Sequence, residues 1–177
     1  MAPLPPPSSW LLKQAERLPD QAAILDFAAG YGRHCRALDQ TFPNKFIITA
    51  VDRDADALAL IKKAVPTSTV ICTDLEAETA WPFASRRFNA VLVTNYLFRP
   101  KLAMLFDLVV VGGYLFYETF ADGNAAFGKP SNPDYLLKPD ELPATMPAAF
   151  EQIDYFHGKV TMPRPAMIQR FAARRRS

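Results

Sequence analysis

Short apolar runs recur along the chain, and a polar residue follows or closes each of them. The runs cover residues 23–25, 46–51, 69–72, 88–93 and 114–117, and the polar residues are Asp26, Asp52, Asp74, Asn95 and Glu118. Such runs, rich in β-branched and aromatic residues, are typical of parallel strands buried on both faces. The intervals of 21 to 26 residues leave room for a crossover helix each. Because ligands of open α/β sheets bind at the carboxyl ends of the strands, we expect these five side chains at one small-molecule-binding rim.

The segments between and after these runs predict helices and a final pair of strands. Apolar spacing and capping residues favour helices over residues 10–17, 32–42, 54–65 and 100–108, and a short one from 139. Residues 150–157 and 166–172 resemble two strands, and their short link predicts an antiparallel hairpin. Residues 119–137 carry turn chemistry, for which a substrate-covering lid is preferred over a passive connection.

Length and composition indicate one domain over residues 1–177. The chain has 177 residues, half of them hydrophobic, which is enough to bury a sizeable core. Residues 1–9 form a proline-rich lead that we expect to be flexible, and residues 173–177 a basic tail. A formal charge of +2 is too small to indicate a nucleic-acid partner. A solvated face is the preferred interpretation of the tail, and contact with RNA or an anionic surface is the alternative.

Cysteine and histidine usage argues against a metal site. Cys35 and Cys72 form no CxxC pair, and the only histidines, His34 and His157, have no ligand cluster around them in the sequence. We therefore expect no metal, two reduced thiols and structural roles for both histidines. The N-terminus does not have the pattern of a signal peptide, and no apolar run approaches the ~20 residues of a membrane helix. The expected location is the cytoplasm.

The loop after the first run distinguishes between nucleotide-like ligands. A dinucleotide site requires G-x-G-x-x-G, whereas the matching positions here hold Ala28, Gly30 and Arg33. Asp26, at the head of the loop, would oppose a pyrophosphate but suits an ammonium or sulfonium group. Asp52 lies 20 residues after Gly32, where a carboxylate accepts from ribose hydroxyls; a helix N-cap is the alternative. These features favour S-adenosylmethionine, which has a ribose and positive charges but no phosphate.

The motifs together resemble class I S-adenosylmethionine-dependent methyltransferases. Asp26-x-Ala28-x-Gly30-x-Gly32 resembles their first motif, although glycine is commoner at the position of Ala28. Asp52, Asp74-Leu75 and Asn95-Tyr96-Leu97 are similar to the motifs after the next three strands. Segments 95–100, 117–120 and 128–137 resemble a bacterial subgroup related to tellurite-resistance-type methyltransferases. The resemblance covers about residues 20–172.

The resemblance implies a fold and a set of cofactor contacts. The fold is α/β, a single Rossmann-like doubly wound sheet of seven strands in the order 3-2-1-4-5-7-6, with strand 7 antiparallel. Asp26 would face the methionine ammonium, Asp52 the ribose, and Asp74 with Leu75 the adenine. The full set of implied cofactor residues is Asp26, Ala28, Gly30, Gly32, Asp52, Asp74, Leu75 and Asn95.

Catalytic and substrate residues are less well defined by the sequence. Asn95 is a candidate near the reactive methyl group, with a helix cap as the alternative. Glu118 is a candidate base or substrate ligand, with a structural carboxylate as the alternative. A surface-turn role is the alternative for Asp74. Candidate substrate-side residues are Tyr31, Tyr96, Arg99, Phe120 and Tyr135, although aromatic residues more often serve packing.

The leading hypothesis is in-line methyl transfer from S-adenosylmethionine to a small-molecule acceptor. A nicotinamide-dependent oxidoreductase and a non-catalytic binding module are the alternatives. Residues 95–98 lack the prolines of the N-P-P-Y motif, which disfavours nucleic-acid base methylation. The basic tail leaves an RNA methyltransferase as a further alternative. No membrane partner is expected, and the protein should be a monomer or a weak homodimer.

Overall fold

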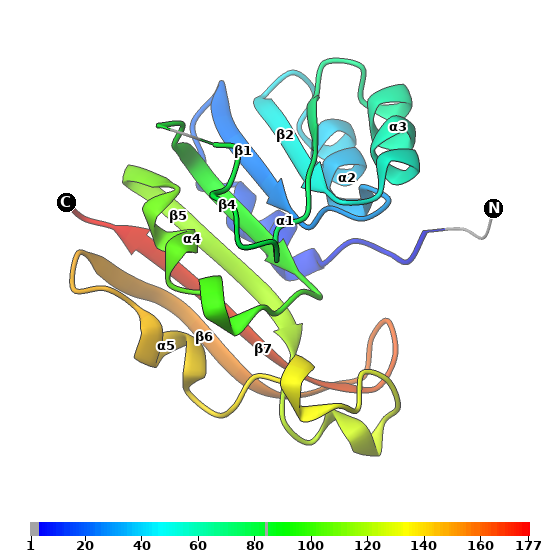
Figure 1. Cartoon of the computed structure of the whole chain (residues 1–177), viewed down its shortest axis with the longest axis vertical. Helices are drawn as coiled ribbons and strands as arrows, with labels where there is room; N and C mark the ends of the chain where they lie inside the picture. The colour runs from blue at the N-terminus through cyan, green and yellow to red at the C-terminus, as the bar shows by residue number, and fades with distance from the viewer. Residues whose placement is uncertain (1–3, 84) are drawn as a thin grey trace.

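Seven strands form one sheet in the computed structural model, which describes residues 4–83 and 85–177 (Figure 1). The strand order is β3-β2-β1-β4-β5-β7-β6, and β7 runs antiparallel to both of its neighbours. The fold that the resemblance implies is therefore confirmed. The strands are β1 (Ala22–Phe27), β2 (Phe46–Asp52), β3 (Thr69–Cys72), β4 (Phe88–Thr94), β5 (Val109–Phe120), β6 (Phe150–Val160) and β7 (Ala166–Arg175).

Helices cover both faces of the sheet. Neighbouring residues of a strand point to opposite sides, so the apolar strands present side chains to be buried on both faces. Ile24 of β1 packs in the core cluster under α1, α2 and α3, whereas Leu25 packs in the cluster under α4 and α5. The helices are α1 (Ser9–Ala15), α2 (Arg33–Thr41), α3 (Ala55–Ala64), α4 (Met104–Asp107) and α5 (Glu141–Thr145), with 3₁₀ turns at Arg99–Lys101, Asn124–Ala126 and Pro133–Tyr135. Figure 1 shows α4 and α5 on the near face of the sheet.

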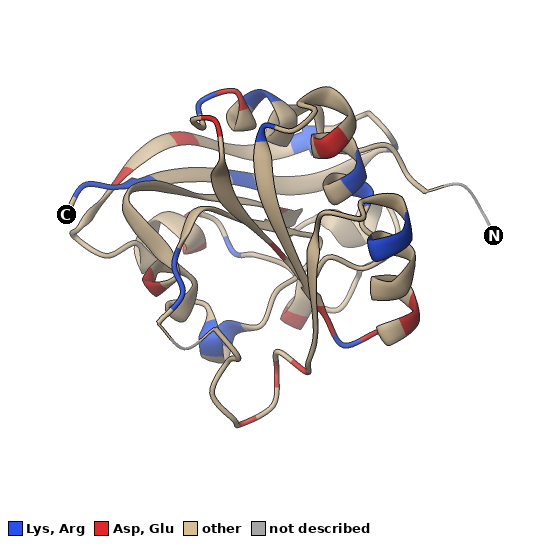
Figure 2. Cartoon of the chain, turned by 90° about the horizontal axis from the view of Figure 1, so that it is seen from above, with Lys and Arg blue, Asp and Glu red and all other residues tan. Residues whose placement is uncertain are grey.

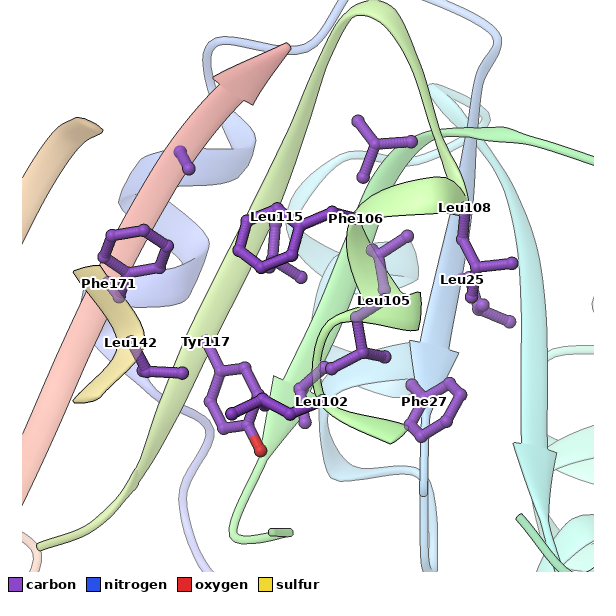
Figure 3. Close-up of a cluster of buried hydrophobic side chains, with 14 of the residues drawn as sticks. Leu25, Phe27, Leu102, Leu105, Phe106, Leu108, Leu115, Tyr117, Leu142 and Phe171 are labelled. Atoms are coloured by element: carbon purple, nitrogen blue, oxygen red, sulfur yellow. The ribbon is translucent and has the colours of Figure 1, made fainter. Parts of the chain in front are cut away.

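The cluster under α4 gives the sheet a rigid base (Figure 3). Phe106 of α4 meets Phe150 and Phe171 edge to face, with ring centroids 4.9 and 6.5 Å apart. Leu115 and Tyr117 of β5 lie beneath the same helix. Full burial of a side chain of this size stabilises the fold by about 1.5–3 kcal/mol. This packing fixes β4 and β5, whose ends carry candidate site residues.

The parallel register brings the carboxyl ends of the central strands level with one another. Phe27 of β1 pairs with Val51 of β2 and with Val93 of β4, and Thr94 pairs with Glu118 of β5. Asp52, Asp74, Asn95 and Glu118 therefore emerge at one edge of the sheet, as the spacing predicts, whereas Asp26 is buried.

Two predicted element boundaries need correction. The helix expected over residues 100–108 is a 3₁₀ turn at Arg99–Lys101 followed by the four-residue α4, and β5 begins at Val109. The final strands extend beyond the predicted ranges, to Val160 and Arg175, because β7 is paired on both sides along most of its length.

The described part of the proline-rich lead contacts the start of α2. The Pro6 carbonyl accepts from Arg33 Nη1 at 3.2 Å, and the Ser8 amide donates to His34 Nε2 at 3.1 Å. Ser8 then caps α1 by accepting from the Leu11 amide. Residues 1–3 of the predicted lead lie outside the described residues. None of the helices described here has the length and apolarity that crossing a bilayer requires.

Candidate active site

A first cavity lies at the carboxyl ends of β1, β2 and β3. Its volume is about 140 Å³. Four of the predicted cofactor residues line it, from three separate loops. The lining residues are Ala28, Asp52, Arg53, Asp74, Leu75, Glu76 and Tyr96. The structure thus brings together Ala28 of the first motif, the acid predicted to bind the ribose and the pair predicted to contact the adenine.

Asp52 is oriented by two backbone donors. Its Oδ2 accepts from the Gly30 amide at 2.7 Å and its Oδ1 accepts from the Asp54 amide at 3.0 Å. The helix N-cap is Asp54, whose side chain accepts from the Ala57 amide. The N-cap alternative for Asp52 is therefore wrong, and the carboxylate stands fixed at the cavity with lone pairs left to accept hydroxyl groups.

Asp74 and Leu75 line the first cavity together with Asp52. Asp74 Oδ1 accepts from the Glu76 amide at 2.9 Å, so this carboxylate also holds its own turn. The Leu75 side chain is buried, and its carbonyl accepts from Trp81 Nε1 at 3.0 Å. Asp74 therefore stabilises its own turn and also lines the cavity.

The loop after β1 has left-handed backbone conformations at Ala28, Gly30 and Gly32. Their φ angles are +56°, +52° and +74°. At Gly32 a Cβ would lie 2.3 Å from a carbon of Ile61 on α3, so glycine is required for helix packing as well as for backbone conformation. Ala28 adopts the same left-handed conformation although it has a Cβ. This strain lowers the stability of the fold by about 1–2 kcal/mol relative to an unstrained residue.

Asp26 lies buried beneath this loop and lines neither cavity. Its Oδ2 accepts from Cys35 Sγ at 3.1 Å, and burial raises the pKa of the carboxyl to about 6. Across residues 4–83 and 85–177, three buried side-chain atoms lack a hydrogen-bond partner: Asp26 Oδ1, Arg36 Nε and Tyr96 Oη. A buried carboxylate oxygen without a donor fits a cationic group such as an ammonium.

Asn95 and Tyr96 separate the first cavity from a second one. Asn95 has a φ of +53°, and its amide donates to the Glu118 carbonyl at 3.0 Å. Tyr96 lines the first cavity and Asn95 the second. The residue before the 3₁₀ turn at Pro100 is Phe98, so Asn95 is not the helix cap that was the alternative. Desolvation raises the pKa of the buried Tyr96 hydroxyl.

The second cavity is larger, about 640 Å³, and lies at the ends of β4 and β5. Figure 1 shows the N-terminal lead and the β6–β7 connection at the same end of the sheet. Its walls are mainly apolar, with four charged groups. The lining residues are Pro5, Pro6, Pro7, Ser8, Ser9, Arg33, Asn95, Glu118, Phe120, Val160, Met162, Pro163, Arg164, Ala166, Ile168 and Arg170.

Glu118 is paired within this second cavity. Its Oε2 accepts from Arg170 Nε at 2.6 Å, and its side chain is 12% exposed. Arg170 in turn lies over the ring of Phe156. The structural role that was the alternative for Glu118 is therefore present, and the carboxylate also lies on the cavity wall.

The substrate-side candidates separate into two groups. Tyr96 and Phe120 line cavities. Tyr31 and Tyr135 are exposed and line neither of the two cavities. Arg99 also lines neither cavity. Its guanidinium pairs with Glu141 at 2.6 Å and donates to carbonyls of the 119–137 segment. That network gives Arg99 a structural role in holding the segment.

Sequence reasoning missed several residues of the second cavity. The sequence did contain a signal for Arg33, because this residue occupies the place of the third glycine of a dinucleotide-binding loop. Arg164 had none, because it reaches the cavity only through the antiparallel β6–β7 pairing. His34 joins the Ser8 amide to Thr94 Oγ1. Among the described residues, no group of three or more His, Cys, Asp or Glu side chains could hold a metal ion.

Comparison with known proteins supports a methyltransferase. The model of the family described as "Methyltransferase domain" matches residues 24–113, just over half of the chain. No curated protein matches the sequence. The matched segment runs from within β1 to within β5 and includes the complete lining of the first cavity.

Solved structures share the fold at low sequence identity. A TehB-like S-adenosylmethionine-dependent methyltransferase from Corynebacterium glutamicum has a TM-score of 0.66 and 16% identity, covering 93% of this chain and 85% of that one. The cyclase SpnF has a TM-score of 0.70 and 15% identity, covering 94% and 80%. The plantazolicin methyltransferase BamL, solved with S-adenosylhomocysteine, has a TM-score of 0.67 and 12% identity, covering 93% and 80%. With its motifs, fold and family match in agreement, the chain belongs to the methyltransferase-domain family and is a class I S-adenosylmethionine-dependent methyltransferase.

Proposed function

We propose that this methyltransferase acts on a small-molecule acceptor bound in the second cavity. The observation that carries the proposal is the position of Asn95 and Tyr96, neighbours in the chain that line the second and the first cavity respectively. A volume of about 640 Å³ lies within the range of small-molecule sites. An acceptor there borders the site that we assign to the cofactor.

The roles that we assign within the first cavity follow its chemistry. Asp52, held by two amides, accepts from the ribose hydroxyls. Asp74 and Leu75 bound the adenine end, and we assign the methionine end to the loop of Ala28, Gly30 and Gly32, of which Ala28 lines the cavity.

The buried Asp26 carboxylate attracts the cofactor ammonium from beneath the loop, directly or through water. Arg33, the first residue of α2, is well placed for the cofactor carboxylate, because it follows the glycine loop and lines the second cavity.

Positioning is the main contribution of this chain to the reaction. When bound, the cofactor supplies a sulfonium methyl group, which moves to an acceptor lone pair while the C–S bonding electrons stay on sulfur. Asn95 directs its amide side chain or backbone toward the boundary of the two cavities. Glu118 can take a proton from an acceptor that arrives protonated, although its ion pair with Arg170 opposes this. Alignment alone can remove about 7–11 kcal/mol of barrier.

The subgroup related to tellurite-resistance-type methyltransferases stays part of the proposal. A TehB-like structure is among the neighbours, and its 16% identity supports a shared fold. The second cavity has mainly apolar walls, so we do not carry over an acceptor from any neighbour.

Isothermal titration tests the cofactor assignments. We expect S-adenosylhomocysteine to bind and NAD not to bind, and Asp52→Ala to weaken binding at least tenfold. Asp107→Ala, an exposed acid on α4, is the matched control and should leave binding unchanged. Equal binding by Asp52→Ala and the wild type would contradict the ribose role.

Methyl transfer from labelled S-adenosylmethionine into a cell extract tests the size of the acceptor. Ultrafiltration separates small molecules from macromolecules after the reaction. Label in the small-molecule fraction supports the proposal, whereas label retained entirely with protein or nucleic acid overturns it.

A further inference from the structure

We infer that the acceptor carries a single carboxylate on an apolar body, and that Arg164 recognises this carboxylate. The inference rests on the proposed function, because it takes the second cavity as the acceptor site. It is carried by the charges that line this cavity, by the nature of its walls and by the contacts of Arg164.

The charged groups of the second cavity leave one cation for the acceptor. Three guanidinium groups and one carboxylate line it: Arg33, Arg164, Arg170 and Glu118. Arg170 is neutralised by Glu118 at 2.6 Å. Arg33 lies beside the glycine loop, where we assign it to the cofactor carboxylate. Among the described residues no acid forms an ion pair with Arg164, which leaves one uncompensated positive charge.

One positive charge favours a monoanion over a dianion. A carboxylate carries one negative charge at neutral pH, whereas a phosphate monoester carries nearly two. The planar guanidinium fork matches the two oxygens of a carboxylate, which adds orientation to charge.

The other walls require an apolar body behind the carboxylate. Phe120, Val160, Met162, Ala166 and Ile168 line the cavity together with the prolines of the lead. Burial of apolar ligand surface against such walls favours binding. A small inorganic oxyanion would leave most of these walls uncovered, so charge and shape together indicate an aryl or alkyl carboxylate.

Arg164 is held at the cavity by contacts with uncharged groups. Its Nη2 donates to the Lys129 carbonyl at 3.0 Å, and its guanidinium lies 5.5 Å from the centroid of the Phe120 ring. These contacts use a backbone acceptor and an aromatic face, so they position the guanidinium without neutralising it. They also connect the β6–β7 link to the 119–137 segment, which was expected to cover the substrate.

Equilibrium binding to protein loaded with S-adenosylhomocysteine tests the inference without requiring turnover. The probes are 3-phenylpropionate, its neutral isostere 3-phenylpropionamide, and phenyl phosphate as a dianion. We expect the carboxylate to bind about tenfold more tightly than the amide and more tightly than the phosphate. Arg164→Gln should abolish the preference over the amide, and Arg164→Lys should retain part of it. Lys63→Gln, an exposed cation on α3, is the matched control and should retain all of it.

Two results would overturn the inference: equal binding of carboxylate and amide by the wild type, or an unchanged preference in Arg164→Gln. Tighter binding of phenyl phosphate would overturn the choice of a monoanion. The same titrations measure S-adenosylhomocysteine. Its failure to bind the wild type would overturn the cofactor assignments, whereas intact binding without a carboxylate preference would overturn this inference alone.

Discussion

Asp26 combines a cost in stability with a proposed gain in binding. Its carboxyl is 1% exposed, and desolvation raises its pKa from 3.8 to about 6. Because the folded-state pKa is the higher one, the protonated carboxyl stabilises the fold fully below about pH 4, and this contribution is lost as the pH rises through 6. At neutral pH the buried charge costs about 3 kcal/mol. A cofactor ammonium would offset this cost.

Asp26→Asn should therefore stabilise the ligand-free protein and weaken its ligand binding. Urea denaturation should show a gain of up to about 3 kcal/mol at pH 8 that shrinks toward zero at pH 4. Affinity of the wild type for S-adenosylmethionine should fall as the pH drops below 6, by at most tenfold per pH unit, and this dependence should disappear in the variant. An equal gain in stability at both pH values would contradict the buried-charge explanation.

Ala28 tests whether the first motif carries backbone strain. Its φ of +56° is a conformation that favours glycine, so Ala28→Gly should raise the free energy of unfolding by up to about 1 kcal/mol. Gly30→Ala is the matched reverse change in the same loop. It has φ +52° and open space around a new Cβ, and should lose about 1 kcal/mol by backbone strain alone. Urea denaturation measures both changes, and a loss of stability in Ala28→Gly would refute the strain at this position.

At the scale of elements, one buried side chain connects the lead, α2 and β4. His34 accepts from the Ser8 amide through Nε2, and its Nδ1 lies 3.3 Å from Thr94 Oγ1. Burial, with the charge of Arg33, lowers the pKa of His34 to about 3, so the ring is neutral in the folded protein. The unfolded ring takes up a proton near pH 6.5, so stability falls as the pH drops below that value. This trend opposes that of Asp26.

His34→Leu should release the lead from the wall of the second cavity. The Ser8 amide loses its acceptor, which should cost about 1–3 kcal/mol at pH 7 and speed hydrogen exchange at Ser8. The loss of stability between pH 6.5 and 5 should also become smaller than in the wild type. His157→Leu, in β6, is the matched control for the Ser8 amide and should leave its exchange unchanged. Unchanged exchange in His34→Leu would show that the lead is held by other contacts.

Elements that follow from a local sequence pattern could be predicted. Features that depend on pairing between segments far apart in the sequence could not. The five parallel strands follow from apolar runs that alternate with helices, and Asp52 follows from its position at a strand end. Pairing of Phe120 with Ile168 brings the β6–β7 link to the second cavity, and no sequence pattern encodes that approach. Arg164 was missed for this reason. The N-cap interpretation of Asp52 failed because Asp54, two residues later, reaches the helix amides instead.

At the scale of the whole molecule, the two cavities and the basic tail lie at opposite rims of the sheet. Cavities and their acids lie at the carboxyl ends of the parallel strands. β7 runs the opposite way, so Arg174 lies level with Tyr114 near the start of β5, whereas Arg170 lies level with Glu118. Figure 2 shows basic residues at the C-terminal end of the chain. The tail therefore leaves the molecule at the rim opposite the proposed acceptor site.

This separation predicts that the basic tail does not contribute to methyl transfer. Arg174 and Arg176 pair with Glu151 at 3.8 and 2.9 Å, and exposed pairs contribute at most about 1 kcal/mol each. From Arg170 to Arg176 an extended strand rises about 20 Å, beyond the screening length of about 10 Å at 0.1 M salt. A variant with Arg174→Gln and Arg176→Gln should therefore bind S-adenosylhomocysteine and 3-phenylpropionate within twofold of the wild type, whereas Arg164→Gln should not bind the carboxylate as tightly. If RNA were the acceptor and docked on the tail, the double variant would instead lose salt-sensitive RNA binding and methyl transfer together, because each lost phosphate contact weakens binding in a salt-dependent way.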